Sequence, residues 1–221
     1  MLLKLTGSSC AGKTTLAFAA GERLERLAVH DFDEVGVPEN PDRHWRHRET
    51  ERWVRRALEY QDRGVDLLLT GQSPLGEVLA CPSAPLLDGI AVCLVDVSDE
   101  VRRSRLTARD AGRWDARAVG AFLGWAAWHR EHATNPRHLP GAVVDDGWPD
   151  MAWDRWTGWT ADDPRWCTHL LDTTDRSVSE SADQVEQWVV QQRDALRSER
   201  LPLSRGWSDP AAARADHGTS P

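Results

Sequence analysis

Residues 7–14 read Gly-Ser-Ser-Cys-Ala-Gly-Lys-Thr, and this segment constrains the fold more than any other part of the chain. It follows a short apolar run at residues 2–5 and precedes an apolar, alanine-rich stretch that begins at Thr15. A loop of this pattern between a strand and a helix wraps its backbone N–H groups around a polyphosphate. The positive end of the helix faces the same anion. The segment therefore predicts a strand, a phosphate-binding loop and a helix in succession.

Each position of this loop has an expected physical role. Gly7 and Gly12 allow backbone conformations and a close approach that a side chain would block. Lys13 is expected to reach the β- and γ-phosphates of a nucleotide, and the Thr14 hydroxyl is placed to ligate Mg²⁺. The expected cofactor-binding residues of this segment are Gly7, Ser8, Ser9, Cys10, Ala11, Gly12, Lys13, Thr14 and Thr15.

Short apolar runs alternate with longer helical stretches along the rest of the chain. The expected strands are residues 2–6, 27–31, 66–70, 90–95 and 169–172. The expected helices are residues 14–26, 44–63, 100–109, 116–132 and 179–197. This alternation predicts an α/β fold in which a five-stranded parallel sheet is covered by helices on both faces.

The length of 221 residues suits one domain, which we place at residues 1–200. Tryptophan is unusually abundant at 12 residues, and a Trp-rich region at 148–166 interrupts the α/β pattern before the last expected strand. We expect a lid and this insertion at about residues 105–166, with tryptophan rings packed against the core. Residues 201–221 are rich in Pro, Ser and Ala and are expected to form a weakly ordered tail.

Composition argues against several kinds of partner. The formal net charge of −8 gives no global attraction to nucleic acid or to an anionic membrane. The four cysteines form no C-x-x-C pair, so the sequence indicates neither a zinc ribbon nor a disulfide framework. The apolar run at residues 2–5 is too short for a signal segment or a membrane span. We therefore expect a cytoplasmic protein with no nucleic-acid or membrane partner.

Phosphate-binding loops occur in GTPases and in AAA and motor ATPases as well as in kinases, so later segments must separate these classes. The chain has no N-K-x-D guanine signature, and its only lysines are Lys4 and Lys13. This composition weakens the GTPase interpretation. No run of four apolar residues ends in an Asp-Glu pair, which weakens the AAA and helicase interpretations.

Two carboxylates, Asp31 and Asp33, follow the second expected strand. Residues at the carboxyl edge of a parallel sheet point into the crevice where ligands bind. One carboxylate can hold Mg²⁺, directly or through water, while the other orients a substrate hydroxyl and accepts its proton. Two solvated loop aspartates are the simpler alternative.

Arg105 and Arg109 are four residues apart in the expected helix 100–109, so they share one helix face. They can converge on the charge of a transferring phosphoryl group, and a lid that carries them would exclude water. Arg113 is a weaker candidate for the same lid. The alternative is an amphipathic helix whose arginines are solvated.

These segments together resemble the small-molecule branch of the P-loop kinases, which includes shikimate kinase, gluconate kinase and chloramphenicol phosphotransferase. Asp31 and Asp33 match a D-x-D after the second strand, and Arg105 and Arg109 match an R-L-x-x-R element that enters a lid. The resemblance covers residues 1 to about 110 and 167–195. It implies the three-layer sandwich of P-loop NTPases with a helical lid.

The resemblance also implies roles for individual residues. Asp31 helps to hold Mg²⁺ and Asp33 is the better candidate base, although the reverse assignment stays open. Thr173 and Thr174 lie in the loop that contacts the adenine base in these kinases.

Substrate-binding residues are less well marked. The helix at 44–63 lies where such kinases place substrate-binding helices, and Arg46, Arg48 or Arg52 could meet an anionic or hydroxylated substrate. An exposed charged helix face is the alternative. The third expected strand ends without a Walker B acid, so the metal depends more on Thr14 and Asp31, or Gln72 orients a water or the substrate.

The leading hypothesis is an ATP-dependent phosphotransferase that moves the γ-phosphate to a hydroxyl of a small molecule, with ATP and Mg²⁺ as cofactors. The acceptor could be a metabolite, a nucleoside or an antibiotic, and the protein could form a homodimer. The alternatives are a nucleotide-binding regulatory or partner module with incidental ATPase activity and a polynucleotide 5′-hydroxyl kinase. The expected catalytic residues are Lys13, Asp31, Asp33, Arg105 and Arg109.

Overall fold

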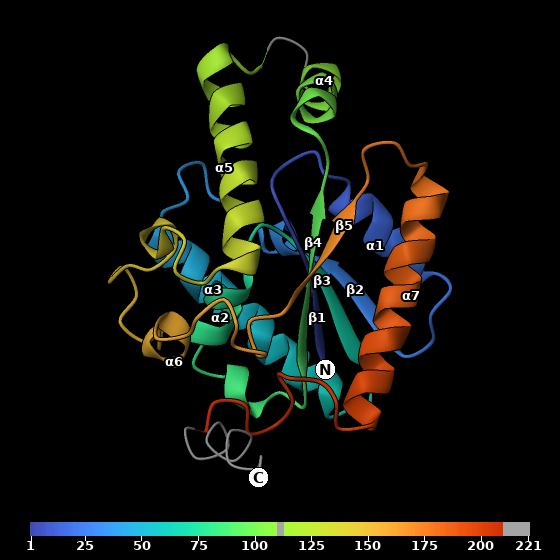
Figure 1. Ribbon diagram of the computed structural model, residues 1–221, viewed down its shortest axis with the longest axis vertical. Helices are drawn as coiled ribbons and strands as arrows, with labels where there is room; N and C mark the ends of the chain where they lie inside the picture. Colours follow the sequence, from blue (N-terminus) through green and yellow to red (C-terminus); the bar gives the residue numbers. More distant parts are fainter. Residues whose placement is uncertain (110–112, 210–221) are drawn as a thin grey trace.

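The computed structural model describes residues 1–109 and 113–209. Its centre is a five-stranded parallel sheet with the strand order β2-β3-β1-β4-β5 (Figure 1). The strands are β1 (Leu2–Thr6), β2 (Leu27–Asp31), β3 (Asp66–Thr70), β4 (Ile90–Asp96) and β5 (Thr168–Asp172). The expected parallel sheet is therefore confirmed. Because β1 lies in the middle, the loop that follows it emerges at the centre of the carboxyl edge.

Helices cover both faces of this sheet, as Figure 1 shows. The helices are α1 (Lys13–Gly21), α2 (Arg43–Gln61), α3 (Leu75–Ala80), α4 (Asp99–Arg109), α5 (Ala116–Thr134), α6 (Asp154–Thr157) and α7 (Val178–Arg197). Short 3₁₀ helices lie at Phe32–Val35, Ala84–Leu86 and Pro140–Ala142. None of the described helices is long and apolar enough to cross a membrane.

The side chains of β1 explain the three layers. Successive residues of a strand point to opposite faces. Leu2 packs in one hydrophobic cluster with residues of α2, α3 and α6, whereas Leu3 and Leu5 pack in a second cluster with α1 and α7. Lys4 shares the face of Leu2, so a charged side chain lies on the α2 and α3 side of the central strand.

Two short helices were not expected from the sequence. All six residues of α3 are buried, and α6 is a single turn within the Trp-rich region. Segments this short do not show a helical period, because the period needs two or more turns to appear. The first helix also ends earlier than expected, at Gly21, where an added Cβ would lie 2.4 Å from Cγ2 of Val29.

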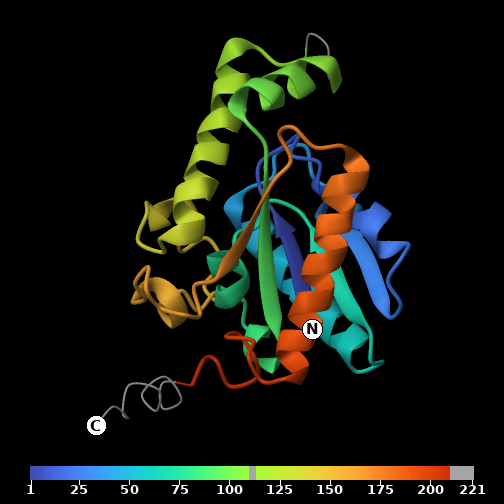
Figure 2. The same cartoon turned by 45° about the vertical axis from the view of Figure 1, so that its right-hand side comes forward.

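The Trp-rich region packs against α5. Trp156 and Trp166 are buried with their ring centroids 5.1 Å apart, and His132 of α5 lies edge-on to both rings. Trp128 of α5 stacks on His132 at 4.3 Å. This aromatic cluster supports the base of α5, whose other end rises with α4 past the carboxyl edge of the sheet (Figure 2).

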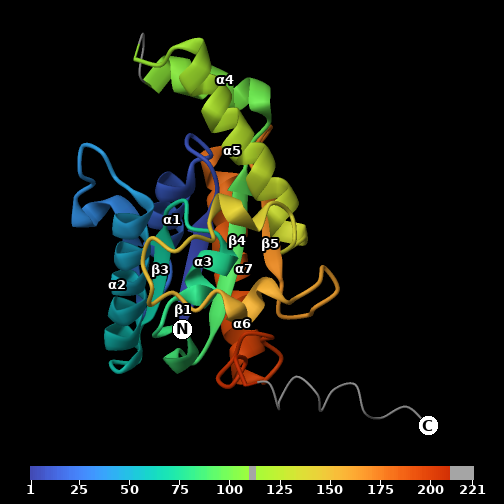
Figure 3. The same cartoon turned by 90° about the vertical axis from the view of Figure 1, so that its left-hand side faces the viewer.

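The first part of the expected tail is packed against the domain. Leu201, Leu203 and Trp207 are all buried, and the Leu203 carbonyl accepts a hydrogen bond from the Ile90 amide at 3.0 Å. These apolar residues cap the bottom of β4, at the end of the molecule opposite α4 (Figure 3). The boundary at 201 is therefore corrected, since residues 201–209 belong to the packed domain. The rest of the expected tail, 210–221, lies outside the described residues.

Two glycine substitutions test how tightly α3 is packed. An added Cβ at Gly76 of α3 would lie 2.6 Å from Cζ2 of the buried Trp156. We expect Gly76→Ala to lower the free energy of unfolding by about 1–3 kcal/mol, because the fully buried indole must shift to admit the methyl group. Gly120 of α5 has nothing within 4 Å of its added Cβ, so Gly120→Ala is the matched control and should raise that energy by about 0.5–1 kcal/mol. Urea denaturation measures both, and equal values for the two variants would contradict the packing described for α3.

Candidate active site

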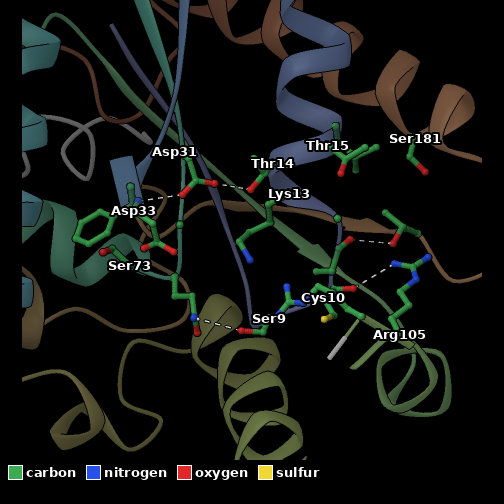
Figure 4. Close-up of a pocket in the computed structure, with 18 of the residues that line it drawn as sticks. Ser9, Cys10, Lys13, Thr14, Thr15, Asp31, Asp33, Ser73, Arg105 and Ser181 are labelled. Carbon is green, nitrogen blue, oxygen red and sulfur yellow. Dashed lines mark hydrogen bonds between the residues drawn. The ribbon is translucent and has the colours of Figure 1, made fainter. Parts of the chain in front are cut away.

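A cavity of about 920 Å³ opens at the carboxyl edge of the sheet (Figure 4). Its lining comes from the loop at 9–13 and the start of α1, from the segments after β2 and β3, from α2 and α4, and from the segment after β5. Side chains that are far apart in the sequence therefore meet at this edge. It is the edge at which ligands bind in open α/β sheets.

The glycines of the loop have the conformations that the motif requires. Gly7 has φ +134°, and an added Cβ there would lie 2.3 Å from the Val95 carbonyl oxygen. Gly12 has φ +95°. The ammonium group of Lys13 is buried and donates to the Ser8 carbonyl at 3.0 Å, so the lysine closes the loop into a ring. Burial and the nearby Arg102 lower the pKa of Lys13 to about 8.

The cavity lining includes every expected loop residue from Ser9 to Thr15, while Gly7 and Ser8 lie behind it. The hydroxyl of Ser8 donates to the Phe122 carbonyl of α5 at 2.9 Å. This bond ties the phosphate-binding loop to α5.

The expected metal-binding pair lies together. The Thr14 hydroxyl donates to Oδ2 of Asp31 at 2.5 Å (Figure 4). The Thr70 hydroxyl donates to the same oxygen at 2.8 Å. Sequence reasoning missed Thr70, which is paired with Asp31 in the register of β2 and β3 and takes the place where a Walker B acid was sought. Hydroxyl and carboxylate oxygens are the donors that Mg²⁺ prefers, so this set fits that ion.

The environments of Asp31 and Asp33 move their pKa values in opposite directions. Burial alone would raise the pKa of Asp31, but hydrogen bonds from Thr14, Thr70 and the Asp33 amide hold it below the ordinary value. Burial raises the pKa of Asp33, and the neighbouring charge of Asp31 raises it further. Such a split favours Asp31 as the carboxylate that stays ionised and Asp33 as the base.

The arginines expected in the lid do not all meet the cavity. Arg105 and Arg109 line the cavity, and Arg105 donates to the Cys10 carbonyl at 3.3 Å. Arg113 is exposed and places its guanidinium over the Trp114 ring, and the cavity lining does not include it. Sequence reasoning missed Arg102, which is completely buried.

Arg102 holds the loop from behind. It donates to the Ser9 carbonyl and, at 2.5 Å, to Oδ1 of Asp96 at the end of β4. Arg130 of α5 donates to the other oxygen of Asp96, also at 2.5 Å. The carboxylate therefore links the loop, α4 and α5. The sequence does carry a signal for Arg102. It lies three residues before Arg105 on one helix, so the two side chains are neighbours on the helix surface.

The segment after β5 forms the wall on the α7 side. Thr173 lines the cavity as expected, and its hydroxyl donates to the Asp96 carbonyl at 3.0 Å. The cavity lining does not include Thr174, whose hydroxyl is bonded to Asp172 and to the Ser98 amide. The lining here includes further residues that sequence reasoning missed, namely Arg176, Ser177, Val178 and Ser181.

The opposite wall contains three of the five residues expected to bind substrate. Arg46 and Gln72 line the cavity with Asp33, and Gln72 donates to the Ser9 hydroxyl at 3.5 Å. Arg48 and Arg52 are exposed, and neither belongs to the described lining. At about 100° per residue, Arg48 lies about 160° and Arg52 about 120° around α2 from Arg46, so neither shares its face. The apolar part of this wall was not expected and consists of Phe32, Val37, Pro41 and Trp45.

Lys4 is a buried charge beneath the site that sequence reasoning did not assign. Its side chain is fully buried on β1, and its ammonium donates to the Leu5 carbonyl at 3.4 Å. The nitrogen lies 2.9 Å from the position of an added Cβ on Gly71, which is part of the cavity lining. Burial and the nearby Lys13 lower the pKa of Lys4 to about 7.

Comparison with solved structures relates the whole fold to known proteins. No family model matches the sequence, and a search of curated proteins finds no match. A sugar kinase from Janibacter sp. HTCC2649, solved without ligand, matches 86% of this chain and 94% of its own with a TM-score of 0.54 and 15% identity. The protein APE1195 matches 86% of this chain and 95% of its own with a TM-score of 0.52 and 19% identity. The chain therefore has the fold of the P-loop kinases, as its motifs predict.

The buried ammonium of Lys4 gives a pH-dependent test. The pKa of Lys4 is about 7 in the folded protein, whereas an ordinary lysine has a pKa of 10.5. At pH values between these two, the unfolded chain therefore binds more protons than the folded protein does. The free energy of unfolding should then rise with pH over this window, by up to about 1.4 kcal/mol per unit. We expect Lys4→Met to stabilise the protein most at or below pH 7 and progressively less toward pH 10. Urea denaturation of both proteins at pH 6.5, 8 and 9.5 measures this difference, and a difference independent of pH would contradict it.

Proposed function

We propose that this protein is an ATP-dependent phosphotransferase that moves the γ-phosphate to a hydroxyl of a small molecule. The observation that carries the proposal is that the phosphate-binding loop, the Asp31 and Asp33 pair and a separate apolar wall line one cavity. The first element suits a triphosphate, the second suits a metal and a base, and the third gives an acceptor a place beside them.

The nucleotide would bind along the loop and the segment after β5. Backbone N–H groups from Ser9 to Thr15 and the ammonium of Lys13 would hold the β- and γ-phosphates. Thr173 and Val178 would face the base side. Thr14 and Asp31 would hold Mg²⁺, which when bound supplies positive charge to the phosphates of the leaving ADP.

The acceptor hydroxyl would lie against Asp33. As its oxygen forms a bond to the γ-phosphorus, the bond between that phosphorus and the ADP oxygen breaks, and the hydroxyl proton passes to the Asp33 carboxylate. Arg105 and Arg109 would stabilise the charge of the transferring group. The α4 segment that carries them would also keep water from competing with the acceptor.

Acceptor-dependent release of ADP tests this function. With a panel of alcohols, sugars and nucleosides, we expect one or more acceptors to raise ADP release above the rate with ATP alone. Lys13→Ala should abolish this increase, because the phosphates lose their main cation. Asp33→Asn should lower kcat by about 10²–10⁴-fold while ATP still binds, because the base is lost and the loop is kept.

Arg48→Ala is the matched control, since it removes an arginine of α2 that the described cavity lining does not include. It should leave both binding and turnover unchanged. ATP binding without acceptor-dependent turnover across the panel would instead favour a nucleotide-binding module. Full activity in Asp33→Asn would rule out this residue as the base.

A further inference from the structure

An internal ion pair closes the acceptor end of the cavity. Arg46 donates from Nε to Oε1 of Glu77 at 3.0 Å, and its Nη2 lies 2.5 Å from Oε2. The side chain of Glu77 is 0% exposed, whereas that of Arg46 is 27% exposed and belongs to the cavity lining. The side chain of Arg46 therefore faces the cavity, and the Glu77 carboxylate that pairs with it lies behind the arginine.

The carboxylate of Glu77 is held in its charged form. The hydroxyls of Thr50 and Ser73 donate to Oε1 at 2.8 Å and 3.2 Å. Burial alone would raise the pKa of Glu77, but the charge of Arg46 and these hydrogen bonds keep it below the ordinary value. Oε1 thus accepts three hydrogen bonds, and Oε2 is paired with Arg46 through the ion-pair contact alone. Both oxygens of this buried carboxylate therefore depend on Arg46.

The guanidinium of Arg46 is fixed on its other sides as well. It lies over the Trp125 ring of α5, 5.5 Å from the ring centroid, and Nη2 also donates to the Gln72 carbonyl at 3.4 Å. Nη1 has no hydrogen-bond partner among the described residues. Arg46 can thus offer a ligand one oriented donor, with little freedom to turn toward a different group.

The charges at this end of the cavity do not sum to a positive value. Arg46 is neutralised by Glu77, and Asp33 is the other ionisable group in this part of the described lining. Asp31 adds a second carboxylate nearby, and Lys4 adds at most one positive charge from behind Gly71. Lys13 also acts on Asp33, but in the proposed complex its charge, like that of Mg²⁺ at Asp31, is taken up by the phosphates of the nucleotide. A carboxylate on the acceptor would therefore approach the Asp33 carboxylate and the γ-phosphate, while the charge of Arg46 is already neutralised by Glu77.

The rest of this wall is apolar. Phe32 and Trp45 meet edge to face, with ring centroids 5.9 Å apart and planes at 88°. Val37 and Pro41 extend the same wall, and the side chain of Val37 is exposed. Such a surface suits the apolar body of a ligand.

We infer that the acceptor is an uncharged alcohol with an apolar or ring body and a hydrogen-bond-accepting oxygen for Arg46, and not a carboxylate or phosphate ester. This inference rests on the proposed function, because it concerns the acceptor of that same site. Glu77 acts as a positioning and specificity residue, since it orients Arg46 and cancels its charge.

Matched acceptors that differ in charge test the inference. The probes are 4-(hydroxymethyl)benzoate and 4-(hydroxymethyl)benzamide, which carry the same ring and the same primary alcohol. We measure kcat/KM from ADP release. We also measure binding to protein loaded with Mg²⁺ and a non-hydrolysable ATP analogue, by ligand-observed NMR. In the wild type we expect the amide to be preferred by about 10-fold or more in both measurements.

Glu77→Gln should uncover the charge of Arg46 while keeping the shape of the side chain. We expect the preference for the amide to fall by about 10-fold or to reverse. The double variant Arg46→Gln/Glu77→Gln removes both charges and should restore a preference for the amide, so the test does not depend on the folding of one variant. Glu49→Gln is the matched control, because Glu49 pairs with the exposed Arg52 on α2. It should leave the preference unchanged.

The outcomes separate the two proposals. Preference for the benzoate in the wild type, or no change of preference in a folded Glu77→Gln variant, would overturn the inference about the acceptor while leaving phosphotransfer intact. Selective binding of the amide without turnover of any acceptor would support the charge argument and contradict the phosphotransferase proposal.

Discussion

The site depends on the two hydrogen bonds that one oxygen of Asp31 accepts. They come from Thr14 at the start of α1 and from Thr70 at the end of β3, so three segments meet at a single carboxylate. The parallel register of β2 and β3 brings Asp31 opposite Thr70, and the phosphate-binding loop sets Thr14 beside them. The same bonds lower the pKa of Asp31, and its charge adds to the effect of burial in raising the pKa of Asp33. One arrangement therefore moves the pKa values of the two carboxylates in opposite directions.

Buried charges surround the site and are costly to desolvate. Lys4, Glu77 and Arg102 are completely buried, and each lies directly behind a segment that lines the cavity. An apolar side chain of similar size would in general be no less stable at such positions. These residues hold other groups of the site in place, because Arg102 bonds to the loop at Ser9 and Glu77 bonds to Arg46. We interpret the cost of their burial as the stabilisation given up to hold the site in one geometry.

Much of this arrangement could be predicted from the sequence. The motif at residues 7–14 and the alternation of strands and helices were enough to predict a parallel sheet, because parallel strands joined by helices have few possible topologies. That topology places Asp31 and Asp33 at the edge of the phosphate-binding loop. Arg105 also lines the expected cavity, since its helix follows β4 at the same edge.

Other features could not be predicted, because they depend on which side of an element meets a neighbour. Arg46, Arg48 and Arg52 look alike in the sequence, and the packing of α2 on α3 decides which one faces Glu77. The burial of Lys4 depends in the same way on what covers β1. The segment at 201–209 has no period of its own. It is held by the burial of Leu201, Leu203 and Trp207 and by the backbone hydrogen bond to Ile90 at the start of β4.

A crystal structure with Mg²⁺ and a non-hydrolysable ATP analogue tests the central claim most directly. We expect the triphosphate to lie along the loop with Lys13 at the β- and γ-phosphates and Mg²⁺ at the Thr14 hydroxyl, with Asp31 bound directly or through water. The Asp33 carboxylate should then face the γ-phosphate across a space open to the wall of Phe32 and Trp45. An Asp33 side chain turned away from the γ-phosphate, or an analogue bound outside this cavity, would contradict the account.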